Sequence, residues 1–516
     1  MASRRISTSH QTMEKLPESD VQSALFDCAG HPITQKGGYM RFFENKNIRS
    51  ALLSIYYLIH VGLSSASAQP SDSTLSQETF LNLVRTFHPI ARQAAIIVDR
   101  ADAGLVAARA GFDPVLSVDA ERKTFDGKYY YEHVNPELRI PTWYGVEIAG
   151  GLERNLGDLL NPELSRGRSS YLGVSIPIAK NLLMDKRRAV LSQARIMRDQ
   201  SLWERRLAIN DLLHEAALRY WNWVQADQVQ RILADAVEVS RQRFRLVRSG
   251  HAQGDRPALD TTEALTQLQA FQLAYNEATL DLAKARLELS DYLWKTNDEP
   301  WYLPPGIRPD NGWIAASLAA GMTPELGRTL ETALREHPKL RILDYKLRSL
   351  EVDRQLKFQD LLPKVDLKYN FLTSGFATPL HAGIEPFRND FKFGLGVSMP
   401  LRLSQGRGLY REAGLKIRET RLGQSQIVWE IENKIRYQFA AVLQLREQWR
   451  QAVDYVRSHE QLWRGEELRF RLGESSLFLV NSRENKLLEA REKLVAVQTK
   501  YLSAFVSLEW SAGQLR

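Results

Sequence analysis

The sequence contains two copies of one long pattern, and this duplication restricts the possible folds more than any other feature. Four segments of the first half return in the second half in the same order. The matching segments are His88-Pro89 with His337-Pro338, Pro114 with Pro363, Gly173–Pro177 with Gly396–Pro400, and Arg245–Gly250 with Phe470–Gly473. Because the repeated unit is far longer than a solenoid repeat, it predicts one protein built from two similar structural halves.

Each half contains a very long helical segment. The chain has neither proline nor glycine between Asp185 and Gly250, and Arg411–Gly473 has a similar length. Shorter helices are expected at 76–112, 257–295, 324–361 and 478–510, stacked end to end along the long ones. Gly250 and Gly473 are predicted to end the long helices as C′ residues. A spacing near 3.5 residues predicts a coiled-coil stripe at Ile431, Ile435, Phe439, Val442, Leu445, Trp449, Val453 and Val456.

Alternating apolar and polar residues predict four β-strands, near 116–120, 172–178, 365–371 and 391–401. A membrane β-barrel and a half-buried soluble hairpin both produce this alternation. Aromatic residues near the expected strand ends and loops favour the barrel; they are Tyr129, Tyr130, Tyr131, Trp143, Tyr144, Tyr171, Phe376 and Phe387. Four strands leave open edges in lipid, so several chains must share the barrel. A further strand-like run at 143–154 is interpreted as an external hairpin.

The N-terminal region predicts export. Residues 40–68 have the basic start, the short apolar run and the small-residue cleavage pattern of a signal peptide. Residues 1–39 are interpreted as an extension of the gene model or a disordered segment. Since Cys28 is the only cysteine, the processed chain would have none, which excludes disulfides and thiolate metal sites. The remaining divisions are a first repeat at 69–300, a linker at 301–323 and a second repeat at 324–513.

Composition and motifs argue against an enzyme or a nucleic-acid-binding protein. The net charge is +8, but 69 basic and 61 acidic residues are interspersed, as on solvated helix surfaces. The ten histidines show no metal-ligand spacing, and His88 and His337 each precede a proline at a helix start. No nucleophile elbow, phosphate loop or dinucleotide fingerprint is present. We therefore expect no catalytic site, no cofactor and no metal.

The chain resembles the TolC family of outer membrane efflux proteins over about residues 76–512. The segments that carry the resemblance are Arg243–Gly250 leading to Leu259–Ala264, Phe470–Leu477 followed by Leu488–Glu492, and the strand ends Ser175–Pro177 and Ser398–Pro400. The resemblance implies an α+β membrane protein that forms a homotrimer. Three chains of four strands would make a twelve-stranded transmembrane barrel, and their helices would form a coiled-coil tunnel in the periplasm.

The resemblance also implies partners and sites. The chain would be a passive exit duct that docks with a periplasmic adaptor protein, which links it to an inner-membrane transporter driven by protons or ATP. The implied docking tips are Val247, Arg248, Ser249, Gly250, Leu472, Gly473, Glu474 and Ser475. Family members often close the periplasmic end with acidic rings, and the candidates here are Asp255, Asp260, Asn481 and Glu484. Asn481 weakens the case for an acidic ring, and exposed carboxylates are commonly plain surface charges.

Two alternatives remain open at the level of the sequence. A periplasmic coiled-coil scaffold with a soluble β end would have the same helices and strands but would dissolve without detergent. Alternatively, the same duct would serve one-step protein secretion instead of small-molecule efflux. The inner-membrane partner selects the cargo, so this sequence does not distinguish the two duct functions.

Overall fold

The computed structural model describes residues 74–516 except 159, 161–163, 311, 313–324 and 377–389. The predicted signal peptide at 40–68, the segment 1–39 and Cys28 lie outside the described residues, as does part of the linker 301–323. The short strands β1 (Thr74–Leu75) and β6 (Arg308–Pro309) pair in parallel, so the start of the linker packs beside the start of the first repeat.

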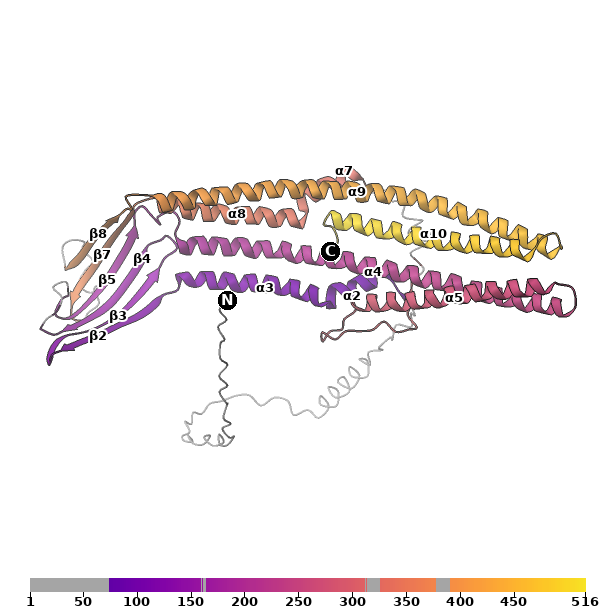
Figure 1. The fold of residues 1–516 in the computed structure, drawn as a ribbon. Helices are drawn as coiled ribbons and strands as arrows, with labels where there is room; N and C mark the ends of the chain where they lie inside the picture. The colour runs from indigo at the N-terminus through magenta and orange to yellow at the C-terminus, as the bar shows by residue number, and fades with distance from the viewer. Residues whose placement is uncertain (1–73, 159, 161–163, 311, 313–324, 377–389) are drawn as a thin grey trace, which may run out of the picture. The chain divides into compact units, whose positions relative to one another are not determined.

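Two long helices run through the described part of the chain, α4 (Lys186–Ala252) and α9 (Ser404–Arg471). They contain 67 and 68 residues, about 100 Å each at 1.5 Å per residue. Helices α3 (Pro89–Arg109) and α5 (Ala258–Ser290) pack along α4, whereas α8 (Pro338–Phe358) and α10 (Leu477–Ser511) pack along α9 (Figure 1). The predicted pairing of each long helix with two short ones is confirmed.

The two His-Pro steps divide helices that were expected to be continuous. Helix α2 (Gln77–Phe87) ends before α3, and α7 (Leu326–Glu336) ends before α8. The Nδ1 atoms of His88 and His337 accept hydrogen bonds from the N–H groups of Ile90 and Lys339, both at 3.2 Å. Each histidine therefore caps the second helix of its pair, and proline follows at the position where its missing N–H costs nothing. The prediction of a helix start at each His-Pro step is confirmed, but the stretches 76–112 and 324–361 are each interrupted there.

The apolar stripe of α9 forms part of the second of two large core clusters. Ile431, Ile435, Val442 and Trp449 are buried against Ala504 and Leu508 of α10, while Phe439 and Leu445 pack at the edge of this cluster. Of the last two residues predicted for the stripe, Val453 is 36% exposed and Val456 is half-buried. The first cluster surrounds Tyr220 and Trp223 of α4 and includes Phe80 and Leu289. Burial of these side chains, each worth about 1.5–3 kcal/mol, holds the helices together.

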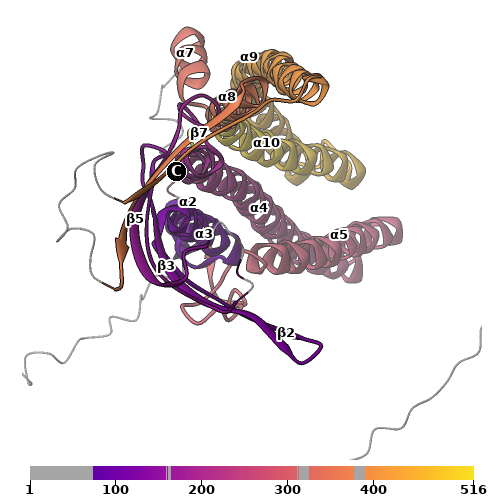
Figure 2. The ribbon, with the colours of Figure 1, turned by 90° about the vertical axis from the view of Figure 1, so that its left-hand side faces the viewer.

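The described residues contain six antiparallel strands in one sheet rather than the four expected. Their order is β2 (Val115–Phe125), β3 (Lys128–Pro141), β4 (Glu147–Leu156), β5 (Gly167–Pro177), β7 (Lys364–Ser374) and β8 (Phe391–Ser398). The strands form a single curved sheet beyond one end of the helices (Figure 2). The interpretation of 143–154 as an external hairpin was wrong, because β4 pairs with β3 on one side and β5 on the other.

Candidate functional site: the two-faced sheet and the helical tips

The six strands align their side chains so that the sheet has one apolar and one polar face. Directly opposed residues of antiparallel strands share a face, so the registers fix the face of each residue. The apolar face contains Leu116, Val118, Ala120, Val134, Leu138, Ile140, Ile148, Leu152, Leu172, Val174, Ile176, Val365, Leu367, Tyr369, Phe371, Phe391, Phe393, Leu395 and Val397. Charged residues occur on this face at the strand ends far from the helices, for example Arg122, Glu132 and Arg154. An apolar band with charges beyond it is typical of a wall in contact with lipid.

The opposite, polar face is joined by contacts between strands. The Tyr171 hydroxyl of β5 donates a hydrogen bond to Glu137 of β3 at 2.6 Å. To reach it, the ring passes over Gly151 of β4, where an added Cβ would lie only 2.6 Å from a ring carbon. Tyr171 was predicted to lie near a strand end, but its side chain lies on the polar face in the middle of β5. Glu137 also pairs with Arg139 at 2.6 Å.

One group on the polar face was not found from the sequence. Potential ligand atoms of Asp119, Glu121 and His133 lie within 4.8 Å of one another. The two carboxylates are two residues apart on β2, and the β2–β3 register brings in the histidine from the neighbouring strand. Spacing within one segment could not indicate this group, because it depends on the hairpin register. Asp119 and Glu121 are exposed and His133 is half-buried, and we assign them no metal.

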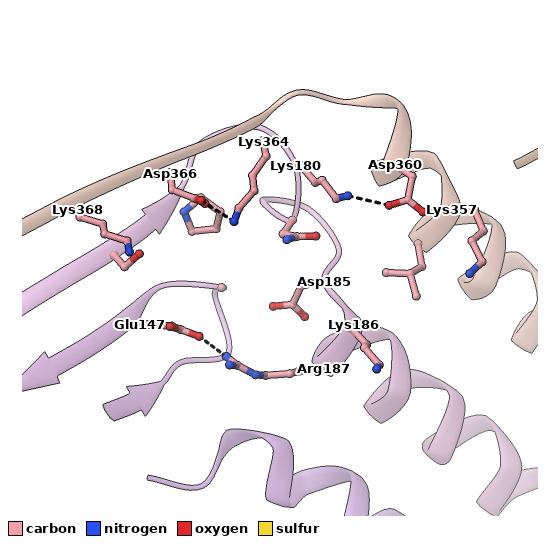
Figure 3. A pocket seen from close by; sticks show the side chains of 15 residues that line it. Glu147, Lys180, Asp185, Lys186, Arg187, Lys357, Asp360, Lys364, Asp366 and Lys368 are labelled. Atoms are coloured by element: carbon pink, nitrogen blue, oxygen red, sulfur yellow. Dashed lines mark hydrogen bonds and ion pairs between the residues drawn. The ribbon is translucent and has the colours of Figure 1, made fainter. Parts of the chain in front are cut away.

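A polar cavity of about 730 Å³ lies where the strands meet the helices (Figure 3). Three ion pairs span or border it: Lys180–Asp360 at 2.9 Å, Arg187–Glu147 at 2.7 Å and Lys364–Asp366 at 3.2 Å. The first pair joins the segment after β5 to the short 3-10 turn Gln359–Leu361 that follows α8. The second pair joins the start of α4 to the start of β4. These contacts fix how the sheet continues into the helices.

The turn at each tip of the long helices is stabilised by one glycine. Gly473 has φ +80° and follows α9, as predicted for a C′ residue. The corresponding residue of the first tip is Gly254, with φ +82°, and not Gly250, because α4 continues to Ala252. The backbone N–H of Asp255 donates to the Gly250 carbonyl, and that of Glu474 to the Arg469 carbonyl, closing equivalent Schellman turns. The prediction for Gly250 was therefore wrong by one helical turn.

The structure divides the predicted docking residues into exposed and buried ones. Arg248, Ser249, Leu472, Gly473 and Glu474 are exposed, whereas Gly250 and Ser475 are half-buried. Val247 is 4% exposed and packs against Ala264 and Leu477, so it is a core residue that a docking protein cannot reach. The Ser475 hydroxyl donates to Glu466. Arg256 of the first tip lies over the Phe470 ring of the second at 4.2 Å, which links the two tips.

The candidate gate residues fall into two groups. Asp255 lies in the first tip turn, and Asp260 in the first turn of α5 is 3.7 Å from Arg256. Asn481 and Glu484 of α10 are each 5% exposed. Both carboxylate oxygens of Glu484 accept hydrogen bonds from Arg243 of α4, at 2.5 and 2.9 Å, and Asn481 accepts a third at 3.2 Å. In this protomer Asn481 and Glu484 thus connect the two helical hairpins.

The comparisons agree with this architecture. Residues 83–293, which contain most of the first repeat, match the family model "Outer membrane efflux protein". The fold is similar to the outer membrane channel CmeC of Campylobacter jejuni, with 16% identity and a TM-score of 0.59 over 85% of this chain and 86% of that one. It is also similar to the outer membrane protein VceC of Vibrio cholerae, with 13% identity and a TM-score of 0.59 over 85% and 96% of the two chains.

A third similar structure is the open state of the MtrE outer membrane channel of Neisseria gonorrhoeae, with 13% identity and a TM-score of 0.58 over 85% and 89% of the chains. A search of curated protein sequences gave no match. No helix among the described residues contains an apolar stretch long enough to cross a membrane.

Proposed function

We propose that the chain is an outer membrane efflux protein and forms the exit duct of a three-part export assembly, because residues 83–293 match that family model and the fold is similar to that of outer membrane channels. The two-faced sheet is the observation that carries this proposal. Its apolar face suits lipid and its polar face suits a water-filled bore, yet β2 and β8 remain open edges. Completion by further copies of the chain removes these edges, and a homotrimer is the arrangement proposed.

The partners are proposed from the position of the tips. The exposed tip residues Arg248, Ser249, Leu472 and Glu474 lie at the ends of the helical hairpins farthest from the sheet (Figure 1). With the sheet in the outer membrane, these ends reach furthest into the periplasm. A periplasmic adaptor protein docks there and connects the duct to an inner-membrane transporter, which supplies the energy and selects the cargo.

The gate is also a proposal. Arg243, Asn481 and Glu484 hold α4 and α10 together near the tips. A bore that widens at this end requires the two hairpins to separate or tilt, and these contacts would oppose that movement. Asp255 and Asp260 lie nearer the tip surface, where their charge would meet entering ions.

Assembly and conduction test the duct itself. The processed protein is expected to fractionate with outer membranes, to form heat-resistant trimers in detergent and to conduct KCl across a planar lipid bilayer. A monodisperse monomer in buffer without detergent would contradict the proposal and favour the soluble scaffold.

Docking is tested with Gly473→Pro. Proline cannot adopt φ +80°, and it removes the N–H that donates to the Phe470 carbonyl at 3.1 Å, so the second tip must change shape. Trimers are expected to remain while ethidium efflux and secretion of native proteins both fall to the level of a deletion strain. Gly423→Ala, at a helical glycine of α9 with open space around it, is the matched control. Normal export by Gly473→Pro would show that this tip is not a docking site.

A further inference from the structure

The hairpin β3–β4 changes the expected barrel. We propose that three copies of this chain close one barrel of eighteen strands, six from each chain, in which β8 of one copy pairs with β2 of the next. This inference rests on the proposed trimeric duct and specifies its wall. The family resemblance implies four strands from each chain and therefore twelve in a trimer. In this chain those four would be β2, β5, β7 and β8, and β3 and β4 are additional.

The registers make β3 and β4 continuous with the rest of the wall. Leu138 of β3 is opposite Leu116 of β2 and Gly150 of β4, while Ile148 of β4 is opposite Val174 of β5. A shift of one residue at any of these pairings would exchange the faces of all later strands. The register between β2 and β3 shifts at Lys123/Thr124, beside the turn far from the helices, and from Val115 to Lys123 it is constant. Over that length the hairpin β3–β4 has the same lipid-type and bore-type faces as its neighbours.

Side chains fasten the hairpin to β5. The Tyr171 hydroxyl crosses β4 above Gly151 to bind Glu137 of β3. Asn370 of β7 similarly lies over Gly173 of β5, where an added Cβ would collide with its side chain. Strands β3 and β4 are therefore joined to β5 by a side chain that lies over a glycine of the neighbouring strand. Strands β5 and β7 are joined in the same way.

The turn between β3 and β4 is anchored on the helices. Trp143 stacks on Phe112 after α3, with ring centroids 4.3 Å apart, and Glu147 pairs with Arg187 of α4 at 2.7 Å. The Thr142 carbonyl accepts a hydrogen bond from the backbone N–H of Gly145, and the Thr142 N–H donates one to the Val146 carbonyl. These two bonds tighten the turn. The β3–β4 hairpin thus contacts the helices through its turn and β5 through Tyr171. Moving the hairpin out of the sheet would break all these contacts.

The two open edges suit each other. Every residue of β2 is exposed and nearly every residue of β8, whereas the four strands between them are mostly half-buried. Strand β2 runs away from the helices and β8 runs back toward them, so a β8–β2 pair between copies is antiparallel, like every other pair in the sheet. On the polar face β2 carries Asp119, Glu121 and Lys123, and β8 carries Lys392. Two of the three charges on β2 are thus opposite in sign to the charge on β8.

The extra strands widen the pore in the membrane. Barrel diameter grows roughly linearly with strand number, so eighteen strands give about 1.5 times the diameter of twelve. Barrels of 16–18 strands leave an aqueous channel. The polar face of β3 and β4 adds Glu137, Arg139 and Glu153 to the lining of that channel.

Cysteine crosslinking tests the edge pairing, since Cys28 is the only native cysteine and precedes the processed chain. Gly394→Cys on the polar face of β8 is combined in turn with Ser117→Cys, Asp119→Cys and Glu121→Cys on β2. Mild oxidation of outer membranes is expected to give covalent dimers and trimers with at least one of these partners. The control combines Gly394→Cys with Glu153→Cys on β4, which should remain uncrosslinked. Trimers that crosslink through β4, or through none of the β2 positions, would overturn the inference.

Imaging of the wild-type chain provides a test without substitutions. Cryo-electron microscopy of the processed protein in lipid nanodiscs is expected to show eighteen strands around a trimer. A trimeric duct with twelve strands would overturn this inference and leave the proposed function intact. Monomeric particles would instead refute the proposed function.

Discussion

Individual side chains hold the two helical hairpins together near their tips. Removing a charge from water costs several kcal/mol unless its partners satisfy it. Arg243 and Glu484 meet this condition, because the guanidinium group engages both carboxylate oxygens while their side chains are only 14% and 7% exposed. Asn481 connects the pair to Glu263 of α5 at 3.2 Å.

Glu484→Ala should destabilise this end of the molecule. The substitution leaves the Arg243 charge buried without its main partner, a loss of about 3–5 kcal/mol for pairs of this kind. Trypsin is expected to cleave near the tips faster, and the thermal unfolding midpoint should fall. Glu467→Ala removes a more exposed pair, Arg471–Glu467 at 2.8 Å, and is expected to cost less than about 1 kcal/mol. Equal effects of the two substitutions would mean that the buried pair has no special role.

Acidification should weaken the helical body through His337. Burial, assisted by the positive charges of Lys339, Lys434 and Arg206 and opposed by Asp211, lowers the pKa of His337 from 6.5 to about 4. The folded protein therefore binds fewer protons than the unfolded chain between these values. Stability from this group is present above pH 6.5 and falls by about 1.4 kcal/mol per pH unit as the pH drops toward 4.

The variant His337→Asn isolates this contribution, because asparagine caps a helix equally well but does not titrate. The difference in unfolding midpoint between pH 7.5 and pH 5 is expected to be smaller in the variant than in the wild type. Other titrating groups, including His214 and the half-buried Glu509, are common to both proteins and cancel in the comparison. An identical pH dependence in the two proteins would contradict the prediction.

Among the elements, the strands show most clearly how sequence pattern and environment are related. Each strand presents alternate residues to two faces, and all six do so in one common register. The apolar face contains Leu395 and Val397 at 57% and 66% exposure. An apolar surface of this extent requires a partner, and in the proposed barrel lipid would cover it along all six strands at once.

Leu395→Arg tests this assignment of faces. An arginine on the lipid face costs roughly 2–4 kcal/mol near the middle of a bilayer, so less protein should assemble in the outer membrane. Gly396→Arg is the matched control on the polar face, where the new side chain lies beside Asp366 and an added Cβ has ordinary contacts. Immunoblots of floated outer membranes measure both variants. A similar loss for both would argue against lipid contact at Leu395.

At the scale of the whole molecule, part of the helical surface has no neighbouring element among the described residues of the protomer. A largely apolar groove of about 520 Å³ runs between α3 and α4, lined by small and apolar residues that include Ala101, Gly104, Ala108, Ala194 and Met197. Small side chains allow a neighbouring helix to approach closely. In the proposed trimer this groove would receive a helix of the next copy.

Gly104→Arg should therefore reduce trimer formation while each protomer still folds. Gly104 is exposed, and an added Cβ has no neighbour within 4 Å in the protomer. Gly327→Arg, at a similarly open glycine of α7, is the control and is expected to leave trimers intact. Native gels of detergent extracts compare the two. Normal trimers of Gly104→Arg would show that the groove lies outside the contact between copies.

Much of the helical architecture follows from the sequence by itself. The absence of proline and glycine between Asp185 and Gly250 allows one very long helix, and the two copies of the pattern predict two similar halves. The His-Pro steps, the stripe from Ile431 to Trp449 and the turn at Gly473 depend on neighbours close in sequence. Local backbone preferences and helical periodicity determine such features, so they could be predicted.

Only the tertiary structure decided the features that depend on pairing across long sequence distances. Strand β3 escaped prediction for a local reason: its tyrosines, charges and Pro136 lack simple alternation, although its sequence neighbours β2 and β4 pair with it. The bond from Tyr171 to Glu137, the buried pair of Arg243 with Glu484 and the burial of Val247 instead join residues of elements that are not consecutive in the sequence. Side-chain burial and partner choice depend on residues up to hundreds of positions away, and a single sequence does not state which of them meet.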